Sequence, residues 1–118
     1  MLAAARPGGL VLDLQVMPPD PRIESGGEVV CEIDGRPLLD WADAARAAVD
    51  ARVAAGDLVE EAVDDHDVLE HYADGAELVH EWATKERRLS QSCAELVRMI
   101  EQPCVVRERC CLTRLRVG

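Results

Sequence analysis

Aspartate and glutamate are the main candidates for functional side chains in this sequence, because they are concentrated in one part of the chain. Thirteen of them lie within residues 40–81, where the only basic residues are Arg46 and Arg52, so the segment carries a charge of −11. The other 76 residues are nearly balanced, with ten acids and eleven bases. Such an acidic surface repels nucleic-acid phosphates and attracts a basic protein by long-range steering.

The acids between residues 60 and 70 are the candidates for binding a partner. Solvated helices explain part of the charge, because six of the thirteen acids belong to capping pairs that begin at Asp40, Asp57 and Asp74. A docking face for a basic protein would explain the other seven. We therefore predict a non-catalytic protein-interaction module of adaptor or immunity type. Its predicted partner-binding residues are Glu60, Glu61, Asp64, Asp65, Asp67 and Glu70.

Three histidines among these acids raise the question of a metal site. His66 and Glu70 are four residues apart, as are Asp67 and His71, so each pair would share one face of a helix. The chain has no His-Glu-x-x-His run, however, and surface ion pairs explain the same spacing. We predict no metal and no cofactor. The alternative function is a small-molecule or metal-binding protein, with a pocket between sheet and helices lined by His66, Tyr72, His80 and Trp82.

The five cysteines lack the Cys-x-x-Cys spacing of zinc and redox motifs. An odd number fits a reducing compartment better than a disulfide framework, so we expect free thiols and a cytoplasmic protein. Cys31 and Cys93 fall on apolar faces and should be buried. Cys110 and Cys111 are adjacent in a predicted strand, which would bury one and expose the other. Because no nucleophile–base pair or phosphate loop can be assigned, we do not expect an enzyme.

The strands that would position these groups are predicted at the two ends of the chain. Alternating apolar residues favour strands over 9–17 and 28–33, separated by a proline-rich loop over 18–27. Asp34-Gly35 is typical of a hairpin turn, after which residues 36–39 are expected to return as a short edge segment. A last strand is expected at the C-terminus, over residues 104–117.

Three consecutive helices are predicted between these strands. Their caps and apolar spacing place them over 40–56, 57–72 and 74–103. The second helix would carry the partner-binding acids on its outer face. We favour one continuous third helix because its apolar seam runs on to Pro103. The alternative is a break near Ser90, since Ser92-Cys93-Ala94-Glu95 is a possible capping box.

These elements predict an α+β fold. A small, mainly antiparallel sheet, made of the N-terminal strands and the C-terminal strand, would be packed by the three consecutive helices. We expect a single domain over 1–118, with flexible segments at 1–8 and 18–27. No stretch approaches the roughly 20 apolar residues of a membrane span. We also expect a homo-oligomer, formed through a sheet edge or through the apolar seam of the third helix.

Overall fold

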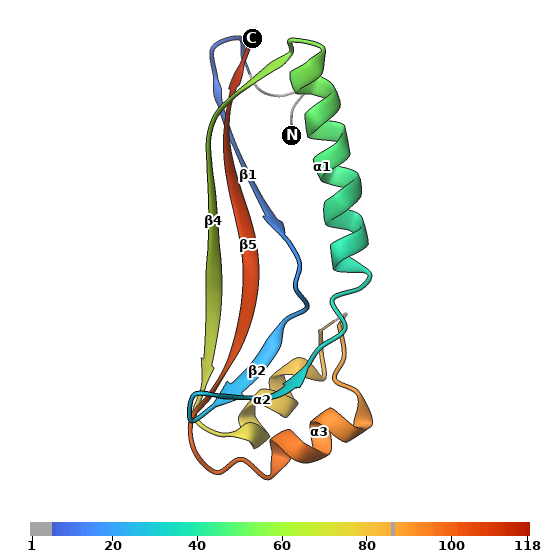
Figure 1. The fold of residues 1–118 in the computed structure, drawn as a ribbon, viewed down its shortest axis with the longest axis vertical. Helices are drawn as coiled ribbons and strands as arrows, with labels where there is room; N and C mark the ends of the chain where they lie inside the picture. Colours follow the sequence, from blue (N-terminus) through green and yellow to red (C-terminus); the bar gives the residue numbers. More distant parts are fainter. Residues whose placement is uncertain (1–5, 86) are drawn as a thin grey trace.

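The computed structural model describes residues 6–85 and 87–118 and has the predicted α+β class, with a mainly antiparallel sheet. Residues 1–5, in the segment predicted to be flexible, lie outside the described part. The molecule measures 52 × 22 × 21 Å, and two long strands run along its length (Figure 1). None of the described helices is both long and apolar enough to cross a membrane. The elements are β1 (Leu10–Val16), β2 (Arg22–Ser25), β3 (Glu28–Glu32), α1 (Leu38–Ala54), β4 (Leu58–Tyr72), α2 (Gly75–Trp82), α3 (Gln91–Arg98) and β5 (Cys104–Val117).

Strand β5 is the centre of the sheet, and all its pairings are antiparallel. Its first residues pair with β2, which pairs in turn with β3, and its second half pairs with β1. Strand β4 follows β5 along nearly its whole length, from Leu58 opposite Val117 to Tyr72 opposite Cys104. The strands predicted at 9–17, 28–33 and 104–117 are therefore confirmed as β1, β3 and β5.

The helices cover opposite faces of the sheet in its two halves. Neighbouring residues of a strand point to opposite faces. Cys104 and Val106 of β5 pack in the cluster that contains Leu78 of α2 and Val97 of α3, whereas Leu115 packs with residues of α1. Figure 1 shows α1 beside the upper half of β4 and β5, and α2 and α3 at the lower end. Each half of the sheet thus has one covered face and one bare face.

The helix predicted over 57–72 is wrong, because residues 58–72 form the 15-residue strand β4. The run is rich in valine, aspartate and histidine, which are poor helix formers, so its local preference for a helix was weak. Pairing with β5 then decides the conformation, because it satisfies the backbone of both strands. The three helices are therefore not consecutive, and the predicted acidic face lies on a strand.

The first helix is confirmed close to its predicted bounds. Asp40 lies in the first turn of α1, although the N-cap position is Pro37, which makes no side-chain capping bond. Gly56 follows the helix with φ +83°, the left-handed conformation expected of a stop residue. The edge segment expected at 36–39 is wrong, because Leu39 N donates to Gly35 O at 3.0 Å and the chain turns directly into the helix.

The continuous helix predicted over 74–103 is also wrong, and the alternative break near Ser90 is correct. Helix α2 begins after Asp74, whose carboxylate accepts from Glu77 N at 2.9 Å as predicted, and ends at Trp82. Helix α3 begins after Ser90, whose hydroxyl accepts from Cys93 N at 3.1 Å. The cap is therefore Ser90 itself and not the box that starts two residues later.

The connection between α2 and α3 contains a buried arginine, Arg87. Arg87 pairs with Glu108 of β5, and its guanidinium lies 5.4 Å from the ring centroid of Trp82. A charged side chain is seldom buried unless it is paired, so Arg87 must reach the strand. The two paired residues are 21 positions apart in the chain, so the contact leaves no periodic signal in the sequence.

Two further features lie outside the predicted pattern. Strand β2 falls inside the 18–27 segment that we expected to be flexible, and the turn at Gly26-Gly27 joins it to β3. Cys31 of β3 and Cys93 of α3 form a disulfide, so the prediction that they are free thiols is wrong. The pair is 62 residues apart, and only the fold brings it together. The cytoplasmic location stays a prediction, and it is no longer supported by the expectation that all five cysteines are free thiols.

Candidate interaction surface

The predicted binding acids lie on β4, next to a strand that supplies their counter-charges. Glu61 pairs with Arg114 and Arg116 of β5, at 3.2 and 3.1 Å. A β-bulge at this point lets Glu61 reach both arginines.

Asp67 is held in the same way by two arginines on the other face of β5. Its carboxylate lies 2.9 Å from Arg107 and 3.2 Å from Arg109. Hydrogen bonds from these guanidinium groups lower the pKa of Asp67 below the ordinary aspartate value, and Arg116 does the same for the pKa of Glu61. The acidic middle and the basic tail of the sequence thus neutralise one another across the β4–β5 ladder.

Glu70 is occupied by a third set of contacts at the lower end of β4. It accepts a hydrogen bond from the hydroxyl of Tyr72 at 2.9 Å and lies 3.4 Å from the ammonium of Lys85. The indole N–H of Trp82 in turn donates to the Tyr72 hydroxyl at 3.1 Å. Burial and the bond to Glu70 raise the pKa of Tyr72, so its hydroxyl stays protonated. This network belongs to the lower core, where it satisfies buried polar groups.

Glu60 and Asp65, two of the six predicted acids, lie near carboxylates of α1 and a single arginine. Arg46 of α1 lies 3.7 Å from Asp50, one turn along the same helix, and the charge of Glu60 also acts on it. Asp43 and Asp65 line a cavity of about 270 Å³ together with Arg46. We call the four carboxylates Asp43, Asp50, Glu60 and Asp65, with Arg46 among them, the acidic groove.

Arg46 is turned into this groove by contacts with β5. Its guanidinium lies 3.4 Å from Thr113 Oγ1 and 3.5 Å from Cys111 Sγ. These contacts and the nearby carboxylates raise the pKa of Arg46 above the ordinary arginine value. The arginine is therefore a fixed charge of the groove, and its four carboxylates leave a local excess of three negative charges.

The remaining predicted acid, Asp64, sits on the opposite face of β4 from Asp65 and outside the groove. Its carboxylate lies 3.2 Å from His66 Nδ1. Sequence reasoning named Glu60 and Asp65 but missed the contributions of α1, because it placed the acids of 57–72 on a separate helix. The arginines near the C-terminus were the one sequence signal that some of these acids would be paired, because they supply the counter-charges.

The four residues of the alternative pocket are dispersed. Tyr72 and Trp82 are buried together, whereas His80 is exposed on α2 and His66 lies opposite Cys110, six residues along β4 from Tyr72. Trp82 lines a cavity of about 170 Å³ with Val79 and Leu89. Among the described residues, no group of three histidines, cysteines or acids could hold a metal ion.

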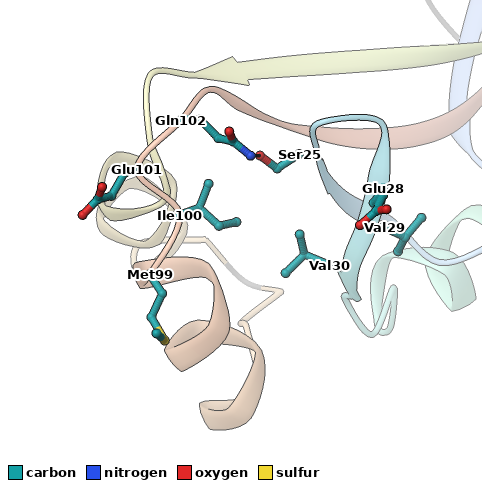
Figure 2. Close-up of a pocket in the computed structure, with 8 residues that line it drawn as sticks. All are labelled: Ser25, Glu28, Val29, Val30, Met99, Ile100, Glu101 and Gln102. Atoms are coloured by element: carbon teal, nitrogen blue, oxygen red, sulfur yellow. Dashed lines mark hydrogen bonds between the residues drawn. The ribbon is translucent and has the colours of Figure 1, made fainter.

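A larger hollow lies at the lower end of the molecule, between the β2–β3 hairpin and the segment after α3. Its volume is about 590 Å³. Figure 2 shows Val29 and Val30 on the hairpin across from Ile100 and Met99, with Ser25 and Gln102 joined at one end. The contact between Gln102 Nε2 and Ser25 Oγ is 3.3 Å. These residues form an open trough whose polar groups include two carboxylates, Glu28 and Glu101, but no base.

The three free cysteines are all buried, which corrects the prediction that one of Cys110 and Cys111 is exposed. The two side chains do point to opposite faces, but both faces are covered where the helical layers change sides. Burial raises the pKa of Cys104 and of Cys110, which disfavours the reactive thiolate.

Comparison of the chain with protein-family models, with curated proteins and with solved structures finds no match.

Proposed function

We propose that the chain is a non-catalytic protein-interaction module that binds a basic partner in the acidic groove between α1 and β4. The observation that carries this proposal is the division among the acids. Glu61 and Asp67 are each paired with two arginines. In the acidic groove the single arginine, Arg46, lies 3.7 Å from Asp50, is acted on by the charge of Glu60 and lines the cavity with Asp43 and Asp65. Carboxylates without a full set of counter-charges attract a basic surface and make its binding fall with salt.

An apolar contact supports the same place. Val63 lies on β4 between Glu60 and Asp65, lines the cavity beside Arg46 and is 45% exposed. A lysine or arginine side chain can lay its aliphatic stem on such a residue and its charge among the carboxylates. A homo-oligomer formed through a sheet edge is part of the same proposal.

A defined cationic probe tests the groove without a known partner. We expect a fluorescent oligolysine peptide to bind at low salt, with an affinity that falls as salt rises. The variant Glu60→Gln/Asp65→Asn should weaken this binding about fivefold.

The matched control is Glu95→Gln/Glu101→Gln, which removes two exposed carboxylates at the lower end of the molecule. It changes the net charge by the same amount and should leave binding nearly unchanged. An equal loss in both double variants would mean that the peptide responds only to net charge, and the groove would be rejected as a binding site.

A small-molecule site is the second candidate function, and a cavity beneath α1 favours it. This half-open hollow has a volume of about 200 Å³ and is lined mainly by apolar side chains that include Val11, Ala48 and Leu115. Asp13 also lines the cavity, and its Oδ2 is buried without a hydrogen-bond partner among the described residues. An apolar cavity with one such carboxylate oxygen suits a small apolar molecule that carries one amine or hydroxyl donor. Native mass spectrometry of the purified protein should then show an added mass that Ala48→Leu removes, and a bare chain would reject the site.

A further inference from the structure

The upper half of the sheet has two edges of opposite character. Among the described strands, β1 and β4 each pair only with β5 there. Exposed edges invite pairing with another chain, and charges along them prevent it. Strand β4 carries six acids, whereas the sequence of β1, Leu-Val-Leu-Asp-Leu-Gln-Val, has a single charge. That charge, Asp13, points to the face under α1. The edge of β1 is therefore the one left open to another strand.

The hydrogen-bond pattern shows which backbone groups of β1 face that edge. Gly9 O accepts from Val117 N, and Met17 N donates to Arg109 O, each at 2.9 Å. In an antiparallel ladder, alternate residues point to the same neighbour. The odd-numbered residues of β1 thus bond to β5, and the N–H and C=O groups of Leu10, Leu12 and Leu14 point outward.

The side chains of the same three leucines form an apolar row on the bare face. Leu10, Leu12 and Leu14 are 48%, 55% and 58% exposed. They lie opposite Arg116, Arg114 and Leu112 of β5, on the face away from α1. A monomer seldom exposes a row of leucines along a strand edge, because apolar surface in contact with water is unfavourable. Pairing with a second strand removes part of this surface from water.

The flank of α1 above β1 is also free of acids. Ala45 and Ala48 line the cavity next to Val11 and Leu12, so this side of the helix faces β1. Trp41 lies one turn before Ala45 on the same side and is 54% exposed. Asp43 and Asp50 belong to the acidic groove on the β4 side. In a chain of net charge −10, two copies can approach along the β1 side without meeting like charges.

We propose that two copies of this chain pair through β1, antiparallel, about a two-fold axis at Leu12. The partner is a second copy of the chain, because a two-fold axis places the outward N–H and C=O groups of Leu10, Leu12 and Leu14 opposite the same groups of the other β1 strand. Leu12 then lies opposite its own copy, and Leu10 lies opposite Leu14. A shift of the axis to Asp13 would set two carboxylates opposite one another, which is destabilising.

The proposed pairing joins the two upper halves into one continuous sheet of six strands, with both copies of α1 on the same face. Trp41 and the alanines of each α1 would lie toward the gap between the two helices. This inference rests on the homo-oligomer of the proposed function and specifies its edge, symmetry and register. It does not depend on the basic partner, because the acidic groove stays on the outer side.

Sedimentation velocity over a dilution series tests the contact. We expect the unmodified chain to be a dimer and Leu12→Lys to raise the dimer dissociation constant at least about tenfold. The matched control is Val59→Lys, at a residue 52% exposed on the same face but on β4. It should leave the dimer intact. If Val59→Lys dissociates it equally, the copies pack face to face and the β1 pairing is rejected. Circular dichroism checks that both variants fold.

Cysteine cross-linking tests the register. Leu12→Cys should form an intermolecular disulfide on mild oxidation, visible as a dimer on a non-reducing gel, because the two-fold axis places it beside its own copy. Val59→Cys, equally exposed but far from the axis, should not. A monomeric wild-type chain would overturn both the homo-oligomer and this pairing. A stable oligomer whose Leu12→Cys variant fails to cross-link would overturn the pairing alone.

Discussion

At the scale of single residues, pairing decides which charges are available for binding. Asp67 and Asp65 are two residues apart on the same face of β4, yet their situations differ. Asp67 is 2.9 Å from one arginine of β5 and 3.2 Å from another. Asp65 lines the cavity of the acidic groove together with Asp43 and Arg46. The residues opposite an aspartate therefore decide whether its carboxylate is held in a structural ion pair or is available to bind a partner.

The ion pairs of Asp67 predict how stability depends on acid. Its pKa is lowered in the folded protein, so the pairs stabilise the fold above the unfolded aspartate pKa, about 3.9, and this contribution is lost as the pH falls toward the folded pKa. Asp67→Asn should therefore make urea stability less sensitive to pH as the pH falls below about 4 at low salt. Asp65→Asn is the control. A steep acid limb retained in Asp67→Asn would contradict the pairing.

The Tyr72 hydroxyl predicts a measurable loss in the lower core. It is the acceptor for the buried indole N–H of Trp82, at 3.1 Å. Tyr72→Phe should reduce the free energy of unfolding by about 1–3 kcal/mol, because the indole N–H is left without a partner. Urea denaturation measures the loss. Glu70→Gln keeps an acceptor for the Tyr72 hydroxyl and should cost less. Equal losses would mean that the charge of Glu70 matters as much as the indole bond, which would contradict the prediction.

At the scale of elements, a local capping signal is correct only where the fold also forms the helix that it would begin or end. Asp74 and Gly56 take the roles that their types predict, as the N-cap of α2 and the residue after α1. Asp57 has the same kind of signal, yet a strand follows it. A capping residue can stabilise a helix only where the following residues form one, and β4 is held by a partner 14 residues long instead.

The N-cap of α3 predicts a difference between two neighbouring serines. Ser90→Ala should lower the free energy of unfolding by about 1 kcal/mol, because Cys93 N loses its acceptor. Ser92→Ala, at the position where the sequence suggested a capping box, should have little effect. Thermal or urea denaturation of the two variants measures the difference. A larger loss for Ser92→Ala would contradict the helix start after Ser90.

At the scale of the whole molecule, two helical layers on opposite faces share β4 and β5. This arrangement explains why adjacent Cys110 and Cys111 are both buried and why each half keeps a bare face. At the lower end, the disulfide Cys31–Cys93 ties the edge strand β3 to α3. The upper half has no such link among the described residues, and its stability depends on the long β4–β5 pairing and on α1.

The disulfide predicts both a thiol count and a loss of stability. The unreduced protein should show three reactive thiols with Ellman's reagent in denaturant, and almost none when folded, because the three free cysteines are buried. Cys31→Ala/Cys93→Ala should lower the free energy of unfolding by about 4 kcal/mol, since the bond closes a long loop in the unfolded chain. Five thiols in unreduced, denatured protein would contradict the bond.

The sequence is sufficient to predict the features that depend on near neighbours along the chain. It predicted the α+β class, the strands at 9–17, 28–33 and 104–117, the first helix, and the helix start at Asp74. Turn residues, caps and period-two alternation act within a few residues, so they can be recognised in the chain. The excess of acid in the middle and of arginine in the tail was equally visible.

The roles of those charges and of the remaining segments depend on contacts between distant parts of the chain. Residues 58–72 form a strand because β5 pairs with them, and the connection between α2 and α3 places Arg87 beside Glu108. The disulfide and the acidic groove likewise join residues far apart in the chain. Such contacts depend on which strand lies beside which, and a periodicity of 2 or 3.6 residues carries no information about that choice.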